Sequence, residues 1–93
     1  MLEKVKLALR ISTDAFDSEL TDMIAAAYLD LGIAGVTNVA ATDALIIRAV
    51  VTYCKMYFGE PDDGQFDRLK KAYDEQKAQL GMATGYTTWG ALT

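Results

Sequence analysis

The sequence predicts an all-α fold, a small four-helix domain around a central apolar helix with a C-terminal tail. Residues 42–59 are almost continuously apolar, so this segment must pack on several sides. The segments before and after it repeat their apolar residues every three or four positions, which is the spacing of an amphipathic helix rather than of a strand. A chain of 93 residues forms a single domain with a thin core.

Composition and charge argue against several classes of function. The chain is 52% hydrophobic and 24% charged, which is typical of a folded globular domain. Its net charge is −4 and it has no histidine, so it lacks the commonest general base and the basic surface of a nucleic-acid binder. The lone Cys54 lies in the apolar segment and is expected to be a buried, inert thiol. We therefore expect no enzymatic activity, no cofactor and no metal.

The first segment predicts a short helix over residues 2–10. Leu2, Val5 and Leu9 follow helical spacing, although the alternation of apolar and basic residues also allows a strand. Helix is favoured because alanine, leucine and lysine all have high helix propensity. The run from Ser12 to Asp14 then predicts a break and a new N-cap.

Residues 15–31 predict a second helix with one apolar stripe. The stripe contains Phe16, Leu20, Met23, Ile24, Ala27, Tyr28 and Leu31. Its acidic residues, among them Asp17, Glu19 and Asp22, suggest a metal site, a surface that repels DNA, or simple solvation. Their spacing matches no metal-binding loop, so solvation and a favourable interaction with the helix dipole is the preferred interpretation. The glycines at 32 and 35 are expected to end the helix.

The apolar segment itself predicts the central helix over residues 43–58. Thr42 is placed to act as its N-cap, and Gly59 can adopt the left-handed conformation that ends a helix. Arg48 and Lys55 are seven residues apart, so they share one face, which we expect to be exposed. Two charges within so short a segment argue against a membrane span.

A turn over residues 60–64 leads to the last predicted helix, residues 65–80. Its apolar stripe is narrow and contains Phe66, Leu69, Tyr73 and Leu80. Ion pairs are expected between Asp67 and Lys71 and between Asp74 and Lys77. A long helix with one narrow stripe leaves its flanks for neighbouring molecules.

Residues 81–93 predict a separate apolar tail after the helical domain of residues 1–80. Gly81 and Gly85 are expected to stop the helix, and no charged residue follows. Large apolar side chains recur along it at Tyr86, Trp89 and Leu92. Such a tail either folds back on its own core or docks on a partner, and aromatic residues are enriched among those that anchor interfaces. Our hypothesis is that these three residues bind a partner.

Several strings in this order resemble the small head–tail connector, or adaptor, proteins of tailed phages and prophages, a DNA-packaging family. They are VKLALRI at residues 5–11, LGIAGV at 31–36, TYCKMYFGEPD at 52–62, FDRLKKAYDEQKAQL at 66–80 and ATGYTTW at 83–89. Together they cover most of the chain. None is a catalytic motif, and no residue-level binding motif is transferred from the family.

The resemblance implies a structural virion protein that assembles as a homo-oligomeric ring under the portal. Such a ring extends the DNA channel and meets a tail-completion or stopper protein, so DNA passes through it without specific binding. The expected location is the virion neck, reached from the host cytoplasm during assembly, with no membrane association. The portal or a neighbouring subunit would then receive Tyr86, Trp89 and Leu92.

One alternative is a small helical module that binds DNA or assists packaging. Its recognition helix would have to use the basic residues of the last helix. These are Arg68, Lys70, Lys71 and Lys77, and acidic residues separate them.

Overall fold

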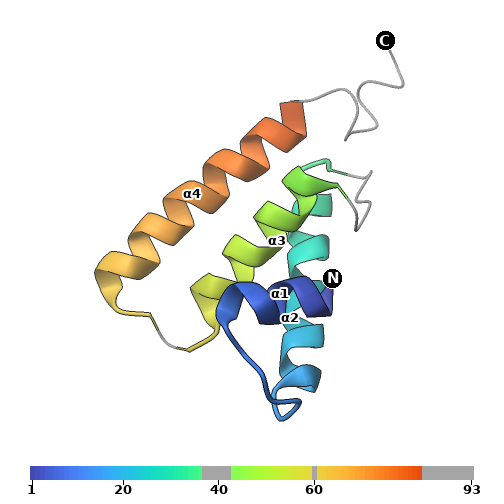
Figure 1. Ribbon diagram of the computed structural model, residues 1–93. Coiled ribbons are helices and arrows are strands. Elements are labelled where there is room, and N and C mark those ends of the chain that lie inside the picture. The colour runs from blue at the N-terminus through green and yellow to red at the C-terminus, as the bar shows by residue number, and fades with distance from the viewer. Residues whose placement is uncertain (37–42, 60, 83–93) are drawn as a thin grey trace.

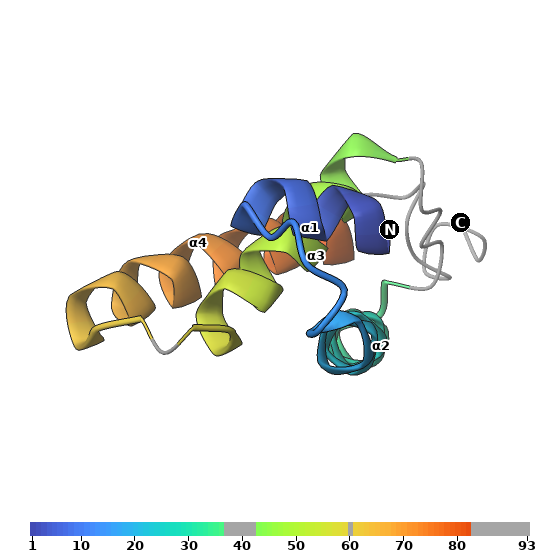
Figure 2. The same cartoon turned by 60° about the horizontal axis from the view of Figure 1, so that its bottom comes forward.

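The computed structural model describes residues 1–36, 43–59 and 61–82, and these form four helices (Figure 1). They are α1 (Leu2–Leu9), α2 (Asp17–Ile33), α3 (Ala44–Tyr57) and α4 (Asp63–Met82). The predicted all-α fold, with its four helices in this order, is confirmed. In the two views α3 lies between α4 on one side and α1 and α2 on the other (Figures 1 and 2). No helix in the described ranges is long and apolar enough to span a membrane.

The hydrophobic core forms around α3, as the apolar central segment predicts. All four helices contribute to it. The buried apolar residues are Val5, Leu20, Ile24, Ala27, Leu31, Val36, Ile46, Ala49, Val50, Cys54, Met56, Tyr73 and Leu80. Phe16, the first residue of the predicted stripe, lies just before α2 and is partly exposed. Its ring makes an edge-to-face contact with Phe58. The core therefore uses one face of each outer helix and most of α3.

The N-terminal cap of α3 is Asp43 and not the predicted Thr42, which lies outside the described residues. One Asp43 carboxylate oxygen accepts hydrogen bonds from the backbone N–H groups of Leu45 at 2.9 Å and Ile46 at 3.4 Å. A carboxylate at this position satisfies free N–H groups and also complements the helix dipole. At the other end Gly59 has a φ of 80°, the left-handed conformation expected there.

A buried lysine joins α1 to the start of α2. Lys6 is only 8% exposed, and its Nζ lies 2.8 Å from an oxygen of Asp14 and 2.9 Å from one of Asp17. Because Asp14 is bonded to Lys6, its carboxylate does not cap α2, and the helix begins at Asp17 rather than near residue 15. The prediction that the segment around Asp14 supplies the N-cap was wrong for this reason. Two of the acidic residues thus neutralise a cation of the same chain.

This contact predicts a specific loss of stability in acid. Bonding to Lys6 holds the pKa of the Asp14 carboxyl below its usual 3.8. The folded state therefore binds protons less readily than the unfolded state, and the stabilisation is complete above pH 3.8 but lost as the pH falls through the lowered pKa. Asp14→Asn and Lys6→Met should both flatten the acid dependence of the unfolding free energy. Urea titrations from about pH 6 to about pH 2 measure this; variants that keep the wild-type acid dependence would contradict it.

The α2 helix continues through Gly32 and ends at Ile33, two residues later than predicted. Gly35 has a φ of 92°, a backbone conformation that glycine adopts readily. The backbone N–H of Val36 then donates to the carbonyl of Leu31 at 2.9 Å, which satisfies one of the last free carbonyls of the helix. Because the helix is longer than predicted, Ile33 belongs to its last turn, where its side chain is exposed.

The α4 helix also begins before its predicted start at residue 65. A carboxylate oxygen of Asp62 accepts a hydrogen bond from the backbone N–H of Gln65 at 2.8 Å, so Asp62 caps the helix and residues 63 and 64 belong to its first turn. Gly81 does not stop α4, which continues to Met82. A Cβ at Gly81 would lie 3.2 Å from the carbonyl oxygen of Ala34, so this glycine permits close packing of α4 against the end of α2.

The ion pairs predicted along α4 were wrong. Lys70 bonds to Asp74 at 2.9 Å, and Lys77 reaches Asp30 of α2 at 3.2 Å. Lys77 follows Tyr73 by one turn on the side that faces α2, and its side chain therefore meets an acid of the neighbouring helix rather than one of its own.

Candidate functional site

A polar cluster between α2 and α4 contains the buried Tyr73 and the partly buried Asp30 and Lys77. The hydroxyl of the buried Tyr73 donates to Asp30 at 2.5 Å, and Lys77 lies 3.2 Å from the same oxygen and 5.1 Å from the centre of the Tyr73 ring. Burial, and then the bond to Asp30, raise the pKa of Tyr73 above its usual value of 10. Tyr73 therefore stays protonated at neutral pH, and the cluster acts as a structural tie between the two helices.

The Cys54 thiol is likewise unsuited to chemistry. It is fully buried in the core, as the sequence predicts, and burial raises its pKa to about 11. A thiol that stays protonated and lacks solvent contact is a poor nucleophile. In the described part of the chain no group of three or more histidine, cysteine or acidic residues could hold a metal ion.

The described residues also include surfaces on which another molecule could bind, and one of them is an uncovered apolar face of α2. Leu29 is 72% exposed and Ile33 is 87% exposed, one turn apart on the side of α2 opposite its buried residues. Asp22 and Ala25 are exposed on the same side, nearer the start of the helix. We call these four residues the α2 outer face. A helix that is apolar on both sides normally has neighbours on both sides.

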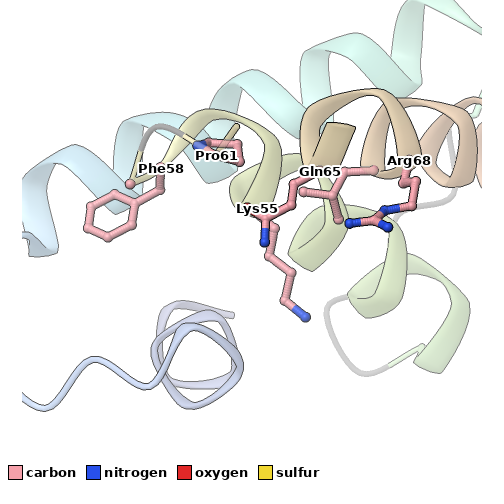
Figure 3. Close-up of a pocket in the computed structure, with 7 residues that line it drawn as sticks. Lys55, Phe58, Pro61, Gln65 and Arg68 are labelled. Carbon is pink, nitrogen blue, oxygen red and sulfur yellow. The ribbon is translucent and has the colours of Figure 1, made fainter. Parts of the chain in front are cut away.

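A second candidate surface is concave and lies at the connection between α3 and α4 (Figure 3). It is a hollow of about 460 Å³ lined by Lys55, Phe58, Gly59, Pro61, Gln65, Arg68 and Leu69. Figure 3 shows Phe58 and Pro61 at one end and Arg68 at the other, with Lys55 and Gln65 between them. Among the described residues that line it none is acidic, and neither cation forms an ion pair with a described residue. We call this site the α3–α4 hollow.

The exposed flank of α4 is polar, and its positively and negatively charged side chains lie next to one another. A shallow groove there is lined by Asp67, Lys70, Lys71, Asp74, Glu75 and Ala78. Its lysines and acids alternate, and Lys70 is paired with Asp74. Such a flank has neither the apolar centre of a tight interface nor the net positive charge of a DNA-binding helix.

The predicted partner-binding residues Tyr86, Trp89 and Leu92 lie outside the described residues, so their role stays a prediction. Sequence reasoning did not single out the α2 outer face. A signal for it exists, because Asp30 is the only charged residue between Asp22 and Asp43 and Leu29 and Ile33 fall outside the predicted stripe. An α2 segment that is apolar all round should have been assigned two packed faces.

Comparison with known proteins gives one match. The family model described as phage connector protein matches residues 1–87, nearly the whole chain. No curated protein and no solved structure matches the sequence. The all-helical fold agrees with the fold that the resemblance implied. The chain therefore belongs to the phage connector protein family.

Proposed function

We propose that this protein is a structural head–tail connector that forms a ring under the phage portal and extends the DNA channel toward the tail. Membership of the phage connector family supports a structural role at the head–tail junction in the virion neck. The ring, the portal contact and the contact with a tail-completion or stopper protein are the parts that we propose.

The observation that carries this proposal is the uncovered α2 outer face. Leu29 and Ile33 are large aliphatic side chains that remain mostly exposed in the isolated subunit. Burial of one such side chain contributes roughly 1.5–3 kcal/mol. A small domain that leaves two of them uncovered, side by side on one helix, gains stability when a neighbour covers them. Ring formation supplies such a neighbour to every subunit.

The charge of the chain suits a channel through which DNA passes without specific binding. The net charge is −4, and a surface of this sign repels phosphates, so a duplex would slide rather than adhere. The alternative DNA-binding module loses two of its four candidate cations, because Lys70 is paired with Asp74 and Lys77 with Asp30. Salt-sensitive retardation of a duplex by the purified protein would favour that alternative.

Sedimentation of the purified protein over a range of concentrations tests the ring. We expect the mass to rise with concentration toward one closed species, since small interfaces close only at high concentration or on a template. A protein that stays monomeric at every concentration, both alone and with its cognate portal, would contradict the proposal.

The tail residues Tyr86, Trp89 and Leu92 are proposed to dock on the portal or on a neighbouring subunit. An aromatic anchor in a desolvated pocket contributes about 2 kcal/mol or more, so Trp89→Ala should weaken capture by the portal by about 30-fold or more. The matched control is Thr88→Ala in the same tail, which should bind like the wild type. Interferometry on immobilised portal measures both. Equal affinities of the two variants would remove Trp89 from the site.

A further inference from the structure

We propose that the α2 outer face of one subunit packs into the α3–α4 hollow of the next subunit in the ring. This inference rests on the proposed ring and names the two surfaces that form it. A ring of identical subunits needs a head-to-tail contact, in which two different patches of the same molecule meet. The described residues contain two such patches that are complementary in shape, charge and position.

The shapes are complementary because one patch is convex and the other concave. The α2 outer face is a helical ridge whose most exposed side chains, Leu29 and Ile33, are aliphatic. The α3–α4 hollow has a volume of about 460 Å³, and Phe58, Pro61 and Leu69 supply its apolar lining. A hollow of this size accommodates a few large side chains projecting from a helix. Contact between the two would bury apolar surface on both subunits.

The charges are complementary as well. Asp22 is exposed at one end of the α2 outer face and makes no ion pair with a described residue. Lys55 and Arg68 are exposed at the hollow and likewise form no ion pair with a described residue. A packed contact would place the acid of one subunit near the two cations of the next. Two α2 outer faces packed against each other would offer Asp22 no cation.

The positions of the two patches suit a chain of subunits rather than a closed pair. The α2 outer face lies on the side of α2 opposite its buried residues. The α3–α4 hollow is a separate surface at the connection between α3 and α4, where Phe58 contacts Phe16 just before the start of α2. A subunit can therefore use its α2 outer face toward one neighbour and its α3–α4 hollow toward the other. Repeating such a contact closes a ring when the rotation between subunits allows it.

Charge reversal with rescue tests this interface. Asp22→Lys alone, and Lys55→Glu with Arg68→Glu, should each weaken self-association by about tenfold or more, since close like charges are repulsive. The triple variant Asp22→Lys, Lys55→Glu, Arg68→Glu carries both reversals and should recover association. Glu75→Lys is the matched control, because it makes the same charge change at an exposed site outside both patches. Sedimentation measures association, and circular dichroism verifies the fold of every variant.

Four outcomes would overturn the inference. The interface is wrong if Asp22→Lys associates like Glu75→Lys, or if the triple variant does not recover, while the wild-type protein still forms rings. In both cases the proposed function stands. If Asp22→Lys loses capture by the portal but keeps self-association, the α2 outer face belongs to the portal contact instead. A wild-type protein that stays monomeric, both alone and with its cognate portal, would contradict the inference together with the proposed function.

Discussion

Ile46→Ala is expected to destabilise the domain by about 2–5 kcal/mol, the largest effect of any single change considered for this chain. Ile46 is fully buried in α3 and belongs to the hydrophobic core to which all four helices contribute. Truncation removes buried methyl groups and leaves a cavity that the neighbouring helices cannot fill completely. A domain of this size has a total stability of about 5–15 kcal/mol, so the loss would be a large part of it.

The adjacent residue provides a matched control. Leu45 is 47% exposed on the same turn of α3, so Leu45→Ala should cost much less than Ile46→Ala. Urea denaturation followed by circular dichroism measures both free energies of unfolding. Equal losses at the two positions would mean that α3 does not face the core as described.

Asp30→Ala is expected to destabilise the domain by about 1–3 kcal/mol, because it leaves the buried Tyr73 hydroxyl without its acceptor. Tyr73 donates to Asp30 at 2.5 Å, and Lys77 loses its ion pair in the same variant. Tyr73→Phe removes the donor instead. If the bond ties α2 to α4, the double variant should cost less than the sum of the two single variants. Fully additive losses in a denaturation cycle would show that the hydrogen bond contributes little.

The number and order of the helices could be predicted because hydrophobic periodicity records which side of each helix is buried. The residues of the α4 stripe illustrate this: Tyr73 and Leu80 are buried, and Phe66 and Leu69 pack against the core. That pattern is local, and each segment carries it independently of its neighbours.

Helix starts were harder to predict because they depend on which carboxylate is free to cap. The run from Ser12 to Asp14 was predicted to supply an N-cap, but the Asp14 carboxylate bonds to Lys6, eight residues earlier. Asp43 and Asp62 do cap their helices, where the sequence offered several adjacent polar residues. The choice among neighbouring candidates is decided by tertiary contacts that a local pattern does not contain.

The contacts between distant residues could not be predicted at all. Lys6 looks like a solvated lysine in a basic segment, and only the packed structure shows it buried against two acids. Tyr73 and Asp30 are 43 residues apart, and no local pattern in either segment predicts the hydrogen bond between them. The candidate surfaces differ in the same way. The local pattern around Leu29 and Ile33 could have indicated the α2 outer face, although sequence reasoning did not single it out, whereas the α3–α4 hollow depends on the packing of two helices.

Electron microscopy of the purified protein mixed with its cognate portal tests the central claim most directly. The account predicts that this chain forms a closed ring bound coaxially to the portal, with an open central channel wide enough for duplex DNA. Leu29 and Ile33 should be covered by a neighbouring subunit in that ring. A portal that binds no copies of the chain, or binds them away from the channel axis, would contradict the claim that this protein is a head–tail connector.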